Sequence, residues 1–190
     1  MLIVGTDPVE VERLLRSEEL VCPDCGSVLA RWGHARERSS RGEDGTVRHV
    51  PRRARCTTCG GTHVLLAQLW LLRRADAVSV IGAALEAKAA GAGHRPIAAA
   101  LDRPASTVRG WLRRFVALAE TVRVGLTRLL YALDPQASAL VPRACVVADA
   151  LEAIGRAAAA AVVRLSAVGP WEFAARASAG LLLAPAPGVG

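Results

Sequence analysis

Residues 22–26 are CPDCG and residues 56–60 are CTTCG, two Cys-x2-Cys pairs that are each followed by a glycine. Two thiolates at this spacing can bind one metal ion at about 2.3 Å, and four thiolates complete the tetrahedral shell of a structural zinc site. The glycine permits the tight turn in which backbone amides point at the sulfur atoms. The pattern predicts one structural Zn²⁺ per chain, with four ligands: Cys22, Cys25, Cys56 and Cys59.

The segment around these pairs, residues 21–66, is rich in Gly, Pro, Thr and Arg and has β-like runs at 28–32, 46–50 and 62–66. We expect a small β zinc ribbon here, with residues 35–45 as a polar, mobile loop. Two accidental pairs of buried thiols would not explain the repeated glycine. A redox Cys-x2-Cys motif would need a strand–helix context, which this segment does not offer.

The other candidate metal ligands are expected to have different roles. Cys145 stands alone among alanines, and we expect it to be a small buried side chain. With four cysteines available, the histidines of the ribbon segment are expected on the surface or beside the ligands. These histidines are His34, His49 and His63.

Residues 93–115, GHRPIAAALDRPASTVRGWLRRF, carry the second pattern. Apolar residues recur at helical spacing on both sides of a turn at 102–103, which predicts helices over about 96–101 and 104–118. The side chains expected to face inward are Ile97, Ala98, Leu101, Val108, Trp111, Leu112 and Phe115. This arrangement predicts a helix-turn-helix, whose second helix can enter the major groove of DNA.

The outer face of the second helix is polar and basic. We expect Ser106 and Thr107 to contact phosphates or base edges, and Arg109, with Arg113, to reach guanine O6 and N7. Residues 91–115 hold five arginines and one aspartate, more than half of the net charge of +7. The alternative is an ordinary helical hairpin with a solvated arginine face. The complete predicted DNA-binding set is Arg103, Ser106, Thr107, Arg109, Arg113, Arg114, Arg52 and Arg53.

Arginines are also concentrated in the ribbon segment. Residues 21–60 contain eight arginines and four acidic residues, and Arg52 and Arg53 lie four and three residues before Cys56. Phosphate contacts position a protein on DNA without reading its sequence. We therefore expect the ribbon and the second helix to form a bipartite basic surface.

Residues 21–115 resemble the N-terminal DNA-binding part of bacterial insertion-sequence transposases and their accessory proteins. The matching stretches are CPDCG, RRARCTTCGGTH and IAAALDRPASTVRGWLRRF. The whole chain is similar to actinobacterial proteins that combine a zinc ribbon with a helix-turn-helix. The resemblance implies binding of double-stranded DNA in mobile elements or in regulation, with a transposase or integrase as a further partner. The nearly neutral, alanine-rich C-terminal half favours helix packing or association with a second copy of the chain.

The chain departs from complete transposases after Phe115, where it is alanine-rich. A transposase carries its acidic triad on a ribonuclease-H-like sheet, which needs strands and a much longer chain. Asp149 and Glu152 share one helical face, an arrangement that is usually solvated. We therefore expect no enzymatic activity. The alternatives to a transposition-associated DNA-binding factor are a transcriptional regulator with the same modules and a protein-interaction adaptor.

The predicted fold is mainly α with a small β zinc ribbon, a helix-turn-helix and a C-terminal helical extension. The expected segments are a strand and helix (1–20), the zinc ribbon (21–66), the helix-turn-helix domain (69–118), the helical extension (119–180) and a flexible tail (181–190). Because no run reaches about 18 uncharged apolar residues, we expect no membrane contact. The N-terminus lacks the basic region of a signal peptide, which favours a cytoplasmic, nucleoid-associated protein.

Five further helices are expected within these segments, one of them from Leu69 to the glycines at 91 and 93. Asp7 followed by Pro8 predicts a helix that ends at about Ser17. The others are expected at 121–133, 144–168 and 171–179, because Asp134-Pro135 and Gly169-Pro170 interrupt the apolar periodicity.

Overall fold

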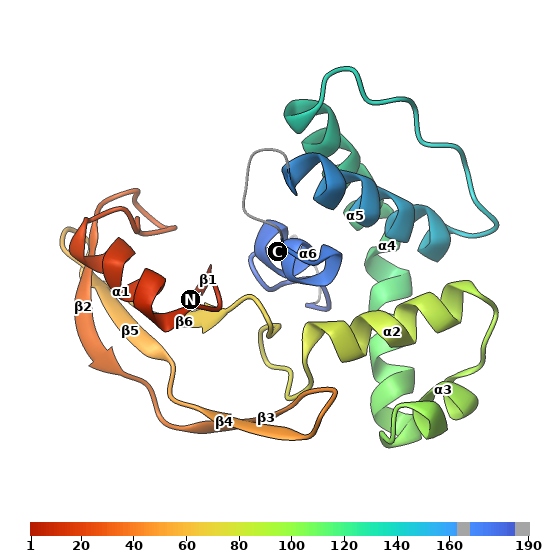
Figure 1. Ribbon diagram of the computed structural model, residues 1–190, viewed down its shortest axis with the longest axis horizontal. Helices are drawn as coiled ribbons and strands as arrows, with labels where there is room; N and C mark the ends of the chain where they lie inside the picture. The colour runs from red at the N-terminus through yellow and green to blue at the C-terminus, as the bar shows by residue number, and fades with distance from the viewer. Residues whose placement is uncertain (163–167, 185–190) are drawn as a thin grey trace, which may run out of the picture.

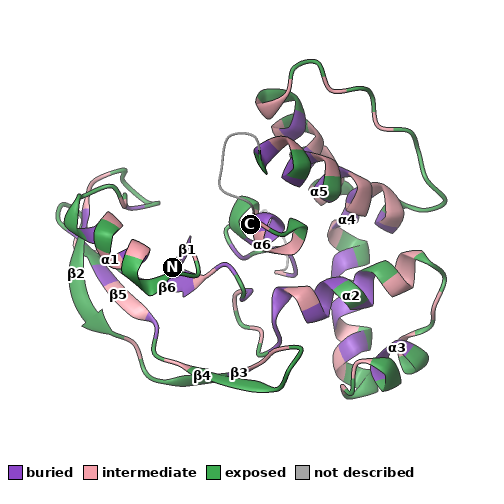
Figure 2. Ribbon diagram, viewed as in Figure 1, coloured by how far each residue is buried: buried purple, intermediate pink, exposed green. Residues whose placement is uncertain are grey.

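The computed structural model describes residues 1–162 and 168–184, which form a mixed α/β protein with six helices and two β-sheets. Figure 1 shows the main sheet and the first helix on one side of the molecule and the other five helices on the opposite side. Each part has its own cluster of buried apolar side chains. Figure 2 shows the buried residues on the inner faces of the long helices.

The main sheet has four strands in the order β1 (Leu2–Val4), β6 (Thr62–Ala67), β5 (Arg52–Cys56) and β2 (Leu29–His34). β1 runs parallel to β6, whereas the other neighbouring pairs are antiparallel. Two of these strands, β2 and β6, overlap the β-like runs predicted from the sequence. β5 was not predicted.

Helix α1 (Pro8–Arg16) begins where the sequence predicts, because the Asp7 side chain accepts a hydrogen bond from Val9 N at 2.8 Å. Its buried residues, Val11 and Leu15, belong to the apolar cluster beneath the main sheet. Since β1 pairs with β6 as well, residues 1–20 share the sheet and the apolar cluster of the cysteine-containing segment. The separate N-terminal segment expected from the sequence is therefore wrong.

A second, two-stranded sheet is formed by β3 (Arg38–Arg41) and β4 (Thr46–His49), which pair from Arg38↔His49 to Arg41↔Thr46. β3 lies in the segment expected to be a mobile loop, so this expectation is corrected. Residues that precede α2 hold the hairpin in place. The His49 ring stacks on Trp70 with ring centroids 5.2 Å apart. The Arg41 backbone also bonds to Ala75 and Ala77.

The helical part consists of α2 (Val78–Ala89), α3 (His94–Ala100), α4 (Ala105–Leu133), α5 (Val146–Val162) and α6 (Pro170–Ala177). α4 packs against α2, α3 and α5, and the shared core of these helices also includes Ile3, Leu66 and Trp70. The residues between β6 and α2 form turns and bridges instead of the helix start expected at Leu69.

α4 is one continuous helix of 29 residues, and the break expected between 118 and 121 is absent. The stretch between Leu118 and Thr121 contains no Pro or Gly to interrupt the helix. Glu120 and Arg123, one turn apart, form an ion pair across this point. The domain boundary predicted between residues 118 and 119 therefore falls inside a helix and is wrong.

The C-terminal segment is also more ordered than expected as far as Ala184. Leu182 and Leu183 are buried, and Arg74 donates a hydrogen bond to Leu183 O at 2.9 Å. The flexible tail predicted for 181–190 is corrected for 181–184, and residues 185–190 lie outside the described residues. The predicted helix over 144–168 corresponds to α5, and residues 163–167 also lie outside them.

Among the helices of residues 1–162 and 168–184, none combines the length and apolar character needed to cross a membrane.

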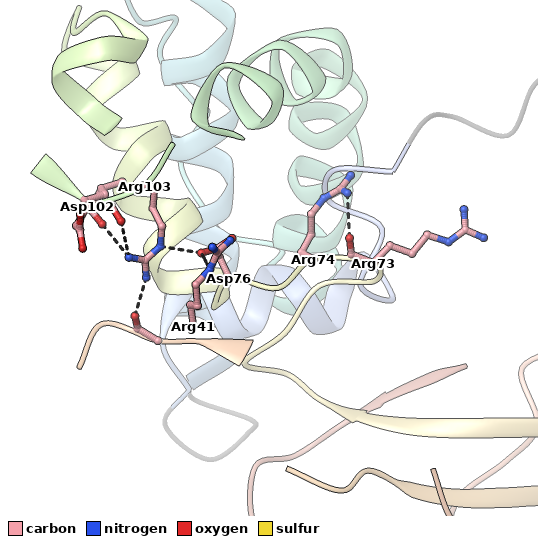
Figure 3. Close-up of polar contacts among 8 residues, drawn as sticks. Arg41, Arg73, Arg74, Asp76, Asp102 and Arg103 are labelled. Atoms are coloured by element: carbon pink, nitrogen blue, oxygen red, sulfur yellow. Dashed lines mark hydrogen bonds and ion pairs between the residues drawn. The ribbon is translucent and has the colours of Figure 1, made fainter. Parts of the chain in front are cut away.

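A buried carboxylate, Asp76, connects the hairpin with the turn between α3 and α4 (Figure 3). Arg41 of β3 donates to both of its oxygens, at 2.9 and 2.8 Å. Arg103 Nε donates to Oδ1 at 2.7 Å, and Arg103 Nη2 donates to Gly42 O at 3.0 Å. One carboxylate thus binds two guanidinium groups at the junction of three chain segments.

We expect Asp76→Ala to lower the free energy of unfolding by about 3 kcal/mol, because removing one partner of a buried ion pair leaves the others uncompensated. Urea denaturation followed by circular dichroism measures this change. Asp44→Ala, at the exposed tip of the hairpin, is the matched control and should shift stability by less than about 0.5 kcal/mol. Equal stability of the two variants would contradict the role assigned to Asp76.

Candidate metal centre and basic surface

The two Cys-x2-Cys pairs fold into similar tight turns. Cys22 N donates to Ser27 O at 2.7 Å, and Cys56 N donates to Gly61 O, the corresponding residue of the second turn, at 2.8 Å. Gly26 and Gly60 have φ values of +74° and +72°, in the left-handed region that favours glycine. The backbone conformation of both turns thus explains why a glycine follows each cysteine pair.

The turns bring the four predicted ligands together, with all four sulfur atoms within 4.8 Å of one another: Cys22, Cys25, Cys56 and Cys59. The sulfur atoms of Cys22 and Cys59 are 3.8 Å apart, and those of Cys25 and Cys56 are 3.4 Å apart. Tetrahedral coordination at about 2.3 Å separates sulfur ligands by about 3.8 Å. A disulfide would require about 2.05 Å. The cluster therefore fits a four-coordinate metal ion.

The surroundings affect the thiols unequally. The backbone amide of Ser27 and the neighbouring Cys56 lower the pKa of Cys25 to about 6. At Cys59 the Gly61 amide acts to lower the pKa, but the sulfurs of Cys56 and Cys25 outweigh it and raise the pKa to about 12. Four adjacent sulfurs repel one another's negative charge, and a bound cation removes this repulsion.

His63 lies beside the sulfur cluster, as the sequence predicts. The side chain is buried, with Nε2 3.4 Å from Cys22 Sγ and 3.7 Å from Asp24 Oδ2. Nδ1 is 3.1 Å from the amino group of Met1. Cys145 was expected to be buried but is exposed, because it lies in the segment before α5.

The inner face of the α3–α4 pair is packed as predicted. The predicted residues that are buried are Ile97, Ala98, Val108, Trp111, Leu112 and Phe115. Leu101 is half-buried at the C-terminal end of α3. This packing leaves the opposite face of the first turns of α4 in solvent.

That outer face forms a basic stripe, which we define as Ser106, Arg109, Gly110, Arg113 and Arg114. The serine and the three arginines are exposed, whereas Gly110 is half-buried. Positions separated by three and four residues lie on one side of a helix. A hollow of about 420 Å³ is lined by these five residues. Thr107, the remaining polar residue predicted here, is half-buried beside the stripe.

Arg103 has a structural position that differs from the expected DNA contact. Its side chain is 13% exposed and bonds to Asp76. Nη1 also donates to Leu101 O and Asp102 O, both at 3.0 Å. Asp102, in the same turn, has a left-handed backbone with φ +49°. The guanidinium thus stabilises the turn between α3 and α4 and is not part of the basic stripe.

The two ribbon arginines differ in their surroundings. Arg52 Nε is 2.5 Å from Glu12 Oε1, and Nη1 donates to Gly33 O at 3.0 Å. Arg53 is half-buried, and within the described residues its side chain has no ion-pair partner. Sequence reasoning did not anticipate the pairing with Glu12, because α1 was assigned to a separate segment.

A group of acidic residues lines another hollow of about 360 Å³, where Glu120 of α4 joins Asp149 and Glu152 of α5. The sequence did not place Glu120 there. Arg143 N donates to Asp149 Oδ1 at 2.6 Å, and Arg143 Nη2 donates to Glu152 at 2.8 Å. Within the described residues, three or more metal-ligating groups meet within 4.8 Å only around the cysteine cluster.

No protein-family model, curated protein or solved structure matches this chain. Its functional interpretation therefore rests on two features of the molecule itself. One is the cluster of four thiols, and the other is the basic stripe of α4.

We expect the purified protein to bind one divalent metal ion per chain, and Cys22→Ser or Cys56→Ser to reduce this stoichiometry sharply. Elemental analysis measures the metal content. Because binding energy at a four-thiolate site is largely folding energy, a chelator should also increase amide hydrogen exchange in residues 21–66. Cys145→Ser is the matched control. Metal content that is equal in all three variants would contradict the assignment.

Proposed function

We propose that this chain is a DNA-binding protein in which α3 and α4 act as a helix-turn-helix. The observation that carries the proposal is the basic stripe of α4, which is exposed on one face while the opposite face is anchored in the core. The major groove of B-DNA is about 12 Å wide and accepts an α-helix. A helix held rigidly by its apolar face can present the stripe to base edges.

The metal in this proposal is Zn²⁺, and residues 21–66 form a zinc ribbon. Zn²⁺ favours tetrahedral thiolate coordination, and four protein ligands leave no open position for a substrate. The ion would supply a cross-link between the turn before β2 and the turn between β5 and β6. These turns carry Cys22 and Cys25, and Cys56 and Cys59, respectively.

The residues of the stripe divide into two roles. Arg109 and Arg113, which are exposed one turn apart, would donate to guanine O6 and N7. Ser106 and Thr107, in the first turn of α4, would contact phosphates or base edges near the positive end of the helix dipole. Arg53 of the ribbon would contact the phosphate backbone.

The proposal includes no catalytic step. Cleavage assisted by two metal ions requires carboxylates that converge on ions about 3.5–4 Å apart. Glu120 is paired with Arg123, and Glu152 with Arg143. These pairs support a structural role for the acidic hollow.

The biological setting in this proposal is an accessory role in transposition, with double-stranded DNA as partner. It carries over the expectation drawn from the sequence motifs of residues 21–115. The DNA chemistry of α4 is independent of this setting and can be tested alone.

We expect Arg109→Ala to weaken binding to a duplex selected from a random pool by about 1–3 kcal/mol and to relax its base preference. Arg53→Ala should weaken binding to all sequences alike, because phosphate contacts carry no sequence information. Fluorescence anisotropy with selected and scrambled duplexes separates the two effects. If an Arg109→Ala/Arg113→Ala variant binds selected DNA as tightly as the wild type, α4 is not the recognition helix. If the wild type shows no salt-dependent duplex binding, a protein-interaction adaptor is favoured.

We also expect the protein to bind DNA without nicking or joining it when Mg²⁺ or Mn²⁺ is present. Incubation of supercoiled plasmid with the wild type, followed by gel electrophoresis, measures this. Nicking that is abolished by Asp149→Ala and retained by Asp44→Ala would overturn the non-enzymatic part of the proposal.

A further inference from the structure

The hollow between residues 71–76 and the first turns of α4 carries positive charge that the described residues do not neutralise. Its volume is about 270 Å³, and its charged lining consists of Arg41, Arg73, Arg74, Arg114 and Asp76. The carboxylate of Asp76 is already bound by Arg41 and by Arg103. Within the described residues, the other three arginines form no ion pair with an acidic side chain.

Arg74 is held in place by uncharged partners. Nη1 donates to Arg73 O at 3.1 Å and Nη2 donates to Leu183 O at 2.9 Å, while the buried Nε has no hydrogen-bond partner among the described residues. Burial, together with the positive charges of Arg114 and Arg73, keeps the pKa of Arg74 below its ordinary value. An anion in this hollow would offset both effects.

Arg73 extends from the same loop. Figure 3 shows its side chain reaching away from Asp76, and the residue is exposed. Its φ is +58°, a left-handed conformation that is uncommon for a residue with a side chain. Arg73 lies in a turn, where this conformation leaves its side chain in solvent and free to move toward a ligand.

Gly110 creates space at the opposite wall of the hollow. A Cβ at this position would lie 2.9 Å from Arg114 Nη1, which donates to Gly110 O at 3.1 Å. Glycine is unfavourable inside a helix. Its presence here allows Arg114 to fold over the helix surface toward the hollow.

We propose that this hollow binds one phosphodiester group of the DNA backbone beside the recognition helix. Arg114 donates hydrogen bonds to the phosphate oxygens, the exposed Arg73 side chain joins it by turning toward the hollow when the phosphate binds, and Arg74 supplies a fixed positive charge. Ser106, at the start of α4, lines the same hollow and provides a hydroxyl donor. The inference rests on the proposed function and adds the 71–76 loop to the DNA-contacting surface.

The first experiment measures binding of the full-length protein to a random-sequence duplex over a series of NaCl concentrations. We expect Arg73→Ala and Arg114→Ala each to weaken binding roughly tenfold and to reduce the slope of log K against log salt by about 0.9. Arg128→Ala, an exposed arginine in the distal half of α4, is the matched control and should leave both quantities unchanged. Melting temperatures of the variants verify that each one folds.

The second experiment titrates inorganic phosphate into the protein at constant ionic strength and follows the NMR signal of Arg74 Nε–H. We expect a saturable shift in the wild type and in Arg128→Ala that is lost in Arg73→Ala and in Arg114→Ala. If the wild type binds duplex DNA but both variants retain its affinity and salt slope, the phosphate site is overturned and the proposed function stands. If the wild type binds phosphate saturably but binds no duplex, the proposed function and the DNA source of the phosphate are both overturned, and the hollow is a site for free phosphate. Absence of both responses would overturn both.

Discussion

The ion-paired cluster around Asp76 is the constraint on which the arrangement of the molecule depends. The carboxylate is 2% exposed, so it needs charged partners that remain in place. Arg41 comes from the β3–β4 hairpin and Arg103 from the turn between α3 and α4. Because Arg103 also bonds to Gly42, the hairpin and this turn are fixed to each other as well as to Asp76. The hairpin and the start of α4 therefore have a defined orientation.

This cluster also separates arginines that build the fold from arginines that remain accessible. Arg103 and Arg52 are engaged by acidic side chains, whereas Arg109 and Arg113 have no such partner among the described residues. The basic surface is consequently narrower than the arginine content of the chain indicates. It includes the first turns of α4 and the neighbouring 71–76 loop. A ligand of this surface would meet cations whose positions are set by the packed helix beneath them.

The features that could be predicted from the sequence are those with local causes. The glycine after each cysteine pair and the apolar spacing around Trp111 identified the metal-ligand turns and the buried face of α4. β3 could not be predicted, because its polar residues are ordered by distant contacts such as the bridge from Arg41 to Asp76. The burial of Leu183 likewise depends on packing far along the chain, and Arg74 bonds to its carbonyl across 109 positions. The basic character of Arg103 was evident, but its buried partner was not.

The continuity of α4 has the largest consequence among these differences. A helix of 29 residues is about 43 Å long, and its two halves cannot reorient as separate domains without breaking backbone hydrogen bonds. Its first turns carry the basic stripe, whereas its later turns pack against α5. Packing of α5 against the later turns of α4 therefore also stabilises the position of the stripe on its first turns. The Asp76 cluster fixes the same helix at its start. The helix that carries the stripe is therefore fixed at both of its ends. This rigidity limits the conformational entropy that the protein would lose on binding a ligand.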